Sequence, residues 1–341
     1  MTERWTWAAA ALAVAAAAGC RAGSEVDREE AFPAGREPAN EREGSAGAAR
    51  AGDEIAIAGR WFHTGARVIP WNDPNGYNAY LERSFFQPTR ASPTEAPDRI
   101  RRYGPARGGL PPEVARRVND EGWTLEVLQR VVSQVVIHFD ACGTSRRCFE
   151  VLHDIRGLSC HFLIDLDGTI YQTLDVKERA WHASQANDSS VGIEIANIGA
   201  YAPGAEAAVL AAWYTSDARG PRGTPPDSAR GPLSRDFVIR PARAELISGV
   251  VNSRQLVQYD FTEEQYTALA RLLTTLRQAL PRIRLAAPEE NGRVRDHAFD
   301  SDQELFAFEG LLGHCHVTRD KVDPGPAFDW RRVLTALAAE R

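Results

Sequence analysis

The sequence predicts an α/β domain over residues 131–341. Short apolar segments with the length of buried strands alternate there with segments of helical pattern, and this alternation is typical of α/β proteins. An Asp-Gly pair between two of the apolar segments adds a tight hairpin. The predicted domain is about 200 residues long, which is within the usual size of a single domain.

The strands are predicted from short apolar or alternating segments. They are 134–138 (QVVIH), 161–165 (HFLID), 169–172 (TIYQ) and 190–196 (SVGIEIA). The second and third flank Asp167-Gly168, a strong signal for a two-residue turn, so they are expected to form a hairpin. Residues 146–154, between the first two strands, are predicted as a helix.

The clearest helix is predicted at residues 262–280. Thr262 and Gln265 have the spacing of a capping box, which satisfies the free amide groups of a helix start. Apolar residues recur at positions 266, 269, 272, 273 and 276, and Pro281 ends the segment.

Three further segments complete the expected secondary structure. Thr124 is a suitable first residue for a helix that runs to about residue 132. A last helix is expected at 329–339. Residues 215–235 are predicted as a loop because they are rich in Gly, Pro, Ser and Asp.

The composition excludes several classes of protein. The chain has 341 residues, of which 43% are hydrophobic and 25% are charged, an ordinary soluble composition. A net charge of −6 gives no support to a nucleic-acid partner. The one long apolar run lies at the N-terminus, which excludes a protein with several membrane spans. Five cysteines are too few for a disulfide scaffold.

Residues 1–20 have the pattern of a secretory signal peptide, too short and too rich in alanine for a stable membrane span. The tetrapeptide AAGC that ends at Cys20 is similar to a bacterial lipobox, so Cys20 is expected to be lipidated and to anchor the chain to a membrane. The alternative is a plain secretory signal in which Cys20 is incidental. Arg21 favours the outer membrane, with the protein facing the periplasm.

Two segments separate this signal from the α/β domain. Residues 21–54 have almost no large apolar groups, so they are expected to form a disordered linker. Residues 55–130 contain many Pro, Gly and aromatic residues. They are predicted as a mostly irregular extension with short helices, packed on the α/β domain.

Three segments carry chemically distinctive side chains. His138 ends an apolar strand, His314 and His316 stand two residues apart, and Asp323 precedes a rigid Pro-Gly-Pro turn. Two imidazoles and one carboxylate with an open fourth position form the hydrolytic type of zinc site. An H-x-H segment in a strand places both rings on one face, so the residues alone do not choose between His314 and His316.

Five motifs, taken together and in order, resemble the type 2 N-acetylmuramoyl-L-alanine amidase family, which includes phage lysozyme-type amidases and peptidoglycan recognition proteins. The motifs are VVIHFDACG, SCHFLIDLDGTIYQ, AWHAS, SVGIEIAN and GHCHVTRDKVDPGPAFDW, within about residues 131–335. The resemblance implies a mixed, mainly parallel sheet flanked by helices, with zinc in a surface groove. It also implies cleavage of the amide between N-acetylmuramic acid and the L-alanine of the stem peptide.

The resemblance also implies the metal ligands. Matched to the family motifs, His138, His314 and Asp323 are expected to bind zinc, and His316 is left to packing or to support of the ligands. Some family members have cysteine at the position of Asp323.

Three further residues match catalytic or substrate positions of the family. Glu194 corresponds to a glutamate proposed as the general base, and strand alternation turns it away from its isoleucine neighbours into the cleft. Lys321 corresponds to the lysine that stabilises charge on the tetrahedral intermediate. His182 matches a wall of the cleft and is expected to hydrogen-bond substrate, although packing beside Trp181 is an equal alternative.

Two cysteines of the domain differ from the family pattern, and two others match a cysteine pair found in part of the family. Cys160 stands where some members have a tyrosine near the metal, which favours the route through Glu194. Cys315 is a second thiol beside a ligand. Peptidoglycan recognition proteins carry a close cysteine pair after the first ligand, so Cys142 and Cys148 are expected to form a disulfide.

The resemblance leaves an alternative function open. The chain is expected to be a zinc amidase that acts on peptidoglycan, because it retains all three ligand positions and the lysine. The alternative is a lipoprotein that binds peptidoglycan without cleaving it, as zinc-free recognition proteins do, or that ties the wall to a membrane. An insertion at about 198–260 has no family counterpart with which to assign its role.

Overall fold

The computed structural model describes residues 50–86, 101–231 and 236–339. The chain divides into two compact units, Met1–Ala51 and Gly52–Arg341, and the account below concerns the second. The expected signal peptide, the lipidation site Cys20 and residues 21–49 of the expected linker lie outside the described residues. Across the described part of the chain, no helix combines the length and the apolar character needed to cross a bilayer.

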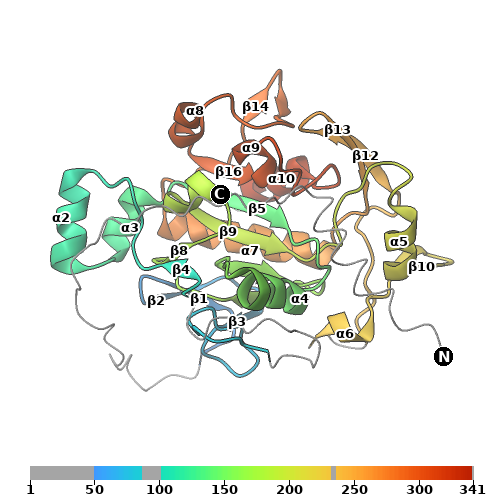
Figure 1. The fold of residues 1–341 in the computed structure, drawn as a ribbon, viewed down its shortest axis with the longest axis horizontal. Coiled ribbons are helices and arrows are strands. Elements are labelled where there is room, and N and C mark those ends of the chain that lie inside the picture. Colours follow the sequence, from blue (N-terminus) through green and yellow to red (C-terminus); the bar gives the residue numbers. More distant parts are fainter. Residues whose placement is uncertain (1–49, 87–100, 232–235, 340–341) are drawn as a thin grey trace. The chain divides into compact units, whose positions relative to one another are not determined.

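A six-stranded sheet with the strand order β16-β5-β9-β6-β7-β3 forms the centre of the second unit (Figure 1). Its strands are β3 (Val68–Pro70), β5 (Gln134–Phe139), β6 (Phe162–Ile164), β7 (Ile170–Gln172), β9 (Ser190–Ile195) and β16 (Gly310–Gly313). Only β6 and β7 pair antiparallel, whereas the other neighbours are parallel. The predicted mixed, mainly parallel sheet is therefore confirmed.

Helices cover both faces of this sheet (Figure 1). On one face, Ile137 of β5 and Ile193 of β9 belong to the same buried cluster as Leu269 of α7 (Glu263–Ala279), and Val333 of α10 (Trp330–Ala339) joins them. On the other face, Leu163 of β6 packs with residues of α4 (Ser145–Phe149) and of the π-helix η1 (Glu150–Arg156). This alternation turns His138 and Glu194 away from α7.

The predicted helix starts are confirmed in detail. Thr262 accepts a hydrogen bond from the backbone N–H of Gln265 (3.1 Å), and the side chain of Gln265 accepts one from the N–H of Thr262 (2.9 Å). Thr124 likewise accepts a bond from the N–H of Val127 (3.3 Å) at the start of α3 (Leu125–Val131). The sequence thus places two of the helices that cover the sheet.

The extension before the domain is more ordered than predicted. It contains the hairpin of β1 (Glu54–Ile57) and β2 (Arg60–His63), and β3 pairs in parallel with β7 of the central sheet. Short helices are present as predicted, with α2 at Pro112–Glu121. Strands of three or four residues are too short to give a periodic signal, so the sequence did not predict them. Most of the described residues of this segment nevertheless lie outside helices and strands, as predicted.

The predicted loop at 215–235 and the insertion around it also contain regular structure. The hairpin of β10 (Tyr214–Asp217) and β11 (Gly220–Gly223) occupies the first half of the loop, although Gly and Pro dominate its composition. The other elements of the second unit are short. They are β4 (Tyr103–Gly104), β8 (Arg179–Ala180), η2 (Ser184–Asp188), α5 (Ala207–Trp213), α6 (Asp227–Arg230), β12 (Ile247–Val251), β13 (Arg254–Gln258), β14 (Glu289–Glu290), β15 (Arg293–Val294), α8 (Asp302–Ala307) and α9 (His314–Val317).

Candidate active site

The two predicted histidine ligands meet because their strands are parallel neighbours. β16 pairs with β5 so that Gly313 lies opposite Ile137. His314 directly follows Gly313, and His138 directly follows Ile137, so the two histidines come next to each other. Their ring centroids are 4.5 Å apart. Residues at the same register of neighbouring parallel strands lie at the same edge of a sheet. This brings together two histidines that are 176 residues apart in the sequence.

Asp323 joins the two rings. Its Oδ2 atom lies 2.8 Å from Nδ1 of His138 and 3.1 Å from Nδ1 of His314. The backbone N–H of Cys315 donates to the carbonyl of Asp323 (2.9 Å), which holds the ligand loop against α9. His138, His314 and Asp323 are 2%, 7% and 8% exposed, so the group is nearly closed to solvent.

This group has the geometry and chemistry of a metal site. The three ligand atoms all lie within 4.8 Å of one another. Ligands at about 2.0 Å from a tetrahedral zinc ion are roughly 3.3 Å apart, so only small movements would be needed to receive one. Two imidazole nitrogens and one carboxylate oxygen are a common ligand set for catalytic zinc.

The protonation states agree with this role. Burial lowers the pKa of His138 to about 4, and the charge of His314 acts in the same direction. Burial alone would raise the pKa of Asp323, but the charge of His314 and the hydrogen bonds from both histidines hold that pKa well below its usual range. Near neutral pH, His138 is therefore neutral and Asp323 is ionised, which are the forms that bind metal.

Glu194 faces the same group from the neighbouring strand. It lies opposite His138 in the register of β5 and β9. As the alternation of SVGIEIA predicts, it faces away from the cluster that holds Ile193 and Ile195. Its Oε2 atom is buried and has no hydrogen-bond partner among the described residues. Burial raises the pKa of Glu194 well above its usual value, and the charges of Asp323 and Asp140 add to this effect.

Lys321 lies on the loop that leads to Asp323 and is half-buried. Its positive charge acts on both His138 and Glu194, which places the side chain on the site's side of the loop. Its backbone N–H donates to the carbonyl of Thr318 (3.2 Å) and fixes the turn after α9.

The predicted substrate residue His182 lies beside a ligand. Its Nδ1 atom is 3.1 Å from Nε2 of His138, and its Nε2 atom is 3.3 Å from Oγ of Ser190. The residue is partly buried. A substrate contact of His182 stays a prediction, while its contact with His138 was not foreseen.

Gly192 makes room for this histidine, and the sequence analysis missed it. A Cβ atom on Gly192 would lie 2.7 Å from Cγ of His182 and 2.8 Å from Sγ of Cys160. Glycine within an otherwise β-branched strand is the available signal, because it often marks a close approach of another group.

The choice between His314 and His316 is also clear. Residues 314–316 do not continue the strand, because they form the short helix α9. The backbone N–H of Gly313 donates to Nδ1 of His316 (2.9 Å), and Nε2 of His316 lies 2.7 Å from the carbonyl of Arg295. Both ring nitrogens of His316 are occupied by backbone groups, so His316 supports the loop, and the geometry favours His314 as the candidate ligand.

The expected disulfide is not present. Cys142, Cys148, Cys160 and Cys315 are all free thiols. Asp140 accepts bonds from the N–H groups of Cys142 and Gly143 (both 2.9 Å) and shapes the loop, while Cys148 is buried against Phe149 in an apolar cluster. A carboxylate therefore stabilises the loop beside His138, where a disulfide was expected.

Arg107, in the extension, is a second residue that the sequence analysis missed. Its buried guanidinium donates to the carbonyls of Val176 (2.7 Å) and Glu178 (2.9 Å) and to those of Asn187 and Ser190 (both 3.0 Å). These carbonyls flank the segment that carries His182. An arginine in a Gly-rich segment gives no sequence signal for such a contact.

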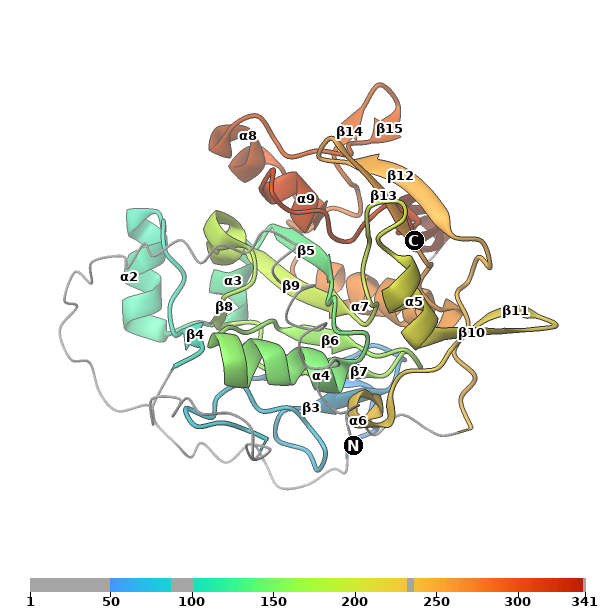
Figure 2. The ribbon, with the colours of Figure 1, turned by 45° about the vertical axis from the view of Figure 1, so that its right-hand side comes forward.

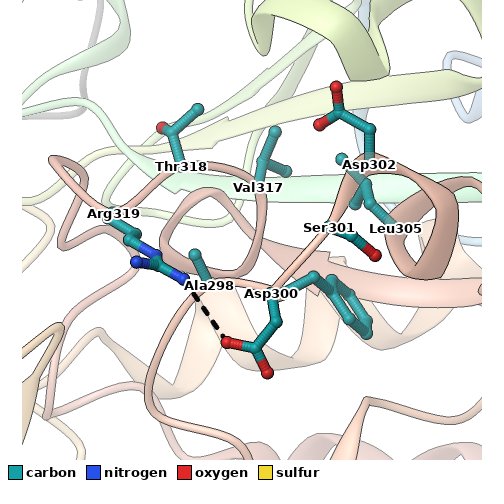
Figure 3. Close-up of a pocket in the computed structure, with 9 residues that line it drawn as sticks. Ala298, Asp300, Ser301, Asp302, Leu305, Val317, Thr318 and Arg319 are labelled. Carbon is teal, nitrogen blue, oxygen red and sulfur yellow. Dashed lines mark hydrogen bonds and ion pairs between the residues drawn. The ribbon is translucent and has the colours of Figure 1, made fainter.

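A surface pocket of about 380 Å³ lies beside the end of α9, and Figure 3 shows the side chains that line it. It is lined by residues of α8 and the segment before it and by Val317, Thr318 and Arg319, and the figure shows Arg319 directed toward Asp300. None of the three candidate ligands lines it. The chemistry therefore lies at the strand ends, outside this pocket.

Comparison with known proteins gives one family and several relatives. A family model described as N-acetylmuramoyl-L-alanine amidase matches residues 128–326. The 1,6-anhydro-N-acetylmuramyl-L-alanine amidase AmpD of Salmonella typhimurium is 24% identical over 195 residues, which are 54% of this chain and 60% of that protein. This chain thus matches less than two thirds of the length of that curated relative.

Solved structures of amidases are also similar. An AmpD derivative is 20% identical, with 61% of this chain and 86% of that chain covered and a TM-score of 0.30. E. coli AmiD, in complex with anhydro-N-acetylmuramic acid-L-Ala-D-γ-Glu-L-Lys, is 17% identical, with coverage of 60% and 57% and a TM-score of 0.33. Pseudomonas aeruginosa AmpDh3, in complex with anhydromuramic pentapeptide, is 18% identical, with coverage of 60% and 59% and a TM-score of 0.33.

Proposed function

The chain belongs to the type 2 N-acetylmuramoyl-L-alanine amidase family, and we propose that it is a zinc-dependent hydrolase of the amide between N-acetylmuramic acid and L-alanine in peptidoglycan. The observation that carries this proposal is the buried group of His138, His314 and Asp323, with the unpartnered carboxylate of Glu194 on the next strand. The name of the Salmonella relative points to the same bond.

The three ligand atoms would be Nδ1 of His138, Nδ1 of His314 and Oδ2 of Asp323. A zinc ion held there supplies a Lewis acid that polarises the scissile carbonyl and makes a nearby water more acidic. The residues around the ligands orient them, transfer the protons and stabilise the charge that develops during the reaction.

His182 controls the tautomer of His138. A proton on Nε2 of His138 is donated to Nδ1 of His182 (3.1 Å), which leaves the lone pair of Nδ1 for the metal. The other nitrogen of His182 then donates to Oγ of Ser190 (3.3 Å), whose hydroxyl donates to the carbonyl of Ala186 (2.6 Å). This series of hydrogen bonds fixes the orientation of the His138 ring from the side opposite the metal position.

Glu194 serves as the general base in this proposal. A cation bound at the ligand group would favour the ionised form of Glu194 against the effect of burial. The free oxygen of the ionised carboxylate accepts a proton from the attacking water while the water oxygen bonds to the amide carbon. The same carboxyl then returns the proton to the nitrogen of L-alanine as the carbon–nitrogen bond breaks. One water is consumed, and its second proton passes from the new carboxyl group to the amine, so the products are a lactyl carboxylate on the sugar and an ammonium group on the peptide.

Lys321 stabilises the developing charge. The amide oxygen becomes negative in the tetrahedral intermediate, and a fixed ammonium group nearby lowers the energy of that state. The positive charge of Lys321 is felt by both His138 and Glu194, which supports this role.

Digestion of isolated sacculi by the zinc-loaded chain tests this function. We expect mass spectrometry to find stem peptides that begin with free L-alanine, together with glycan strands that have lost those peptides. The rival function, a lipoprotein that binds peptidoglycan without cleaving it, predicts that the chain sediments with sacculi and releases nothing. Fragments cut within the glycan or inside the stem peptide would contradict both.

A further inference from the structure

The hairpin of β12 and β13 lies in the insertion, and its tip reaches the loop that carries the ligands. Asn252 and Ser253 form the two-residue turn, and both have positive φ angles (46° and 62°). Asparagine tolerates this left-handed conformation better than most residues do. Figure 2 shows the hairpin alongside α9 and the segment that follows it.

The side chain of Asn252 is saturated by bonds to this neighbourhood. Its amide nitrogen donates to the carbonyls of Lys321 (2.7 Å) and Cys315 (2.9 Å), with a longer contact to the carbonyl of Thr318 (3.3 Å). Its amide oxygen accepts a bond from the backbone N–H of Ala298 (3.0 Å). One side chain therefore connects both ends of the turn between His314 and Asp323.

The body of the hairpin makes this contact rigid. Val251 and Leu256 form a small buried cluster with Cys315, against which Val322 packs. A Cβ atom on Gly249 would lie 2.8 Å from Cβ of Pro326, so the strand passes close to the turn after Asp323. The tip is thus held in place by contacts that do not involve Asn252.

We propose that Asn252 is a positioning residue for the metal centre, through which the insertion sets the spacing of His314, Lys321 and Asp323. The inference rests on the proposed zinc function. The carbonyls that Asn252 binds belong to Cys315, which follows His314, and to Lys321, two residues before Asp323. Loss of these bonds leaves the ligand side chains intact but lets their backbone separate.

Two substitutions distinguish the hydrogen bonds of the Asn252 side chain from the contribution of Asn252 to the hairpin turn. Asn252→Gly keeps the left-handed turn and removes the amide, whereas Asn252→Asp keeps the turn and the acceptor for Ala298 but turns an oxygen toward the three carbonyls. Gln255→Ala is the matched control, because Gln255 is exposed on the same hairpin and its side-chain amide donates to Oγ of Ser248 (2.8 Å), away from the ligand loop.

The test measures zinc affinity by competition with a zinc-binding dye, steady-state kinetics on muropeptides, and thermal unfolding of the metal-free chains. We expect both Asn252 variants to bind zinc about 10- to 100-fold more weakly and to lose kcat more than KM, as is typical when a supporting contact of a ligand is removed. The control should match the wild type, and the unfolding midpoints should stay close to it.

Hydrogen–deuterium exchange of the metal-free chains gives a readout that is independent of zinc. The amides of Cys315, Thr318 and Lys321 are bonded within the ligand loop and should exchange faster in the Asn252 variants alone. Unchanged exchange and zinc affinity would overturn the inference, as would general unfolding of both variants, which would make Asn252 a residue of stability. A wild-type chain without zinc affinity would instead contradict the proposed function, and exchange alone would then decide the role of Asn252.

Discussion

Replacement of Asp323 by alanine is expected to abolish zinc binding and to reduce amidase activity to that of the metal-free chain. Asp323 is the one carboxylate that contacts both histidine ligands, and without it two buried imidazoles would have to hold a divalent cation with no anionic partner. Asp323→Cys should retain far more zinc, because a thiolate is also a zinc ligand. Metal content by mass spectrometry and release of stem peptides from sacculi measure the two effects.

The matched control for this substitution is Asp320→Ala. Asp320 is an exposed aspartate on the same loop, and its backbone carbonyl, which accepts a bond from Arg254, is kept in the variant. It should leave zinc content and activity unchanged. An Asp323→Ala variant that keeps one zinc ion and normal activity would remove Asp323 from the ligand set.

Replacement of Glu194 by glutamine should separate chemistry from metal binding. Glutamine has nearly the same size and still fits beside His138, but its amide does not accept the proton of the attacking water. We expect zinc content to stay unchanged and kcat to fall about 10²- to 10⁴-fold, the usual contribution of a general base. Steady-state kinetics with zinc analysis of the same sample gives both numbers. Loss of zinc in this variant would show that Glu194 has a structural role.

The grouping of His138, His314 and Asp323 was expected from the family motifs, and the structure brings these three residues together. The strand pattern alone contributed the position of His138. QVVIH is apolar enough to be placed in a buried strand, and His138 then falls at its end, next to the partner strand that leads into His314. Alternation along SVGIEIA placed Glu194 on the face opposite Ile193 and Ile195, and the structure confirms this.

The hydrogen-bond partners of individual side chains could not be predicted, because they depend on the backbone conformation at single residues. Whether His316 shares the face of His314 depends on whether the chain continues as a strand or turns into a helix after Gly313, and the chain turns. The predicted disulfide failed for a similar reason. Sequence spacing allowed the pair, but Cys142 and Cys148 are free thiols although both pack in the same apolar cluster, and spacing alone does not fix how two side chains are directed.

Contacts between segments that are distant in the sequence also could not be predicted from local sequence patterns. β3 pairs with β7 although Val68 and Ile170 are far apart in the chain, and three residues carry no periodic signal. The role of Asn252 depends on an inserted hairpin that meets the ligand loop from 63 to 69 residues away. Such contacts are decided by how elements pack, after each has formed.

Titration of the chelator-treated chain with zinc tests the central claim most directly. If His138, His314 and Asp323 form one catalytic zinc site, the metal-free chain should release no stem peptide from sacculi, and activity should rise in proportion to added zinc until one ion is bound per chain. The same titration of Asp323→Ala should stay flat. Full activity in the metal-free wild-type chain, or no activity at any zinc content, would contradict the account.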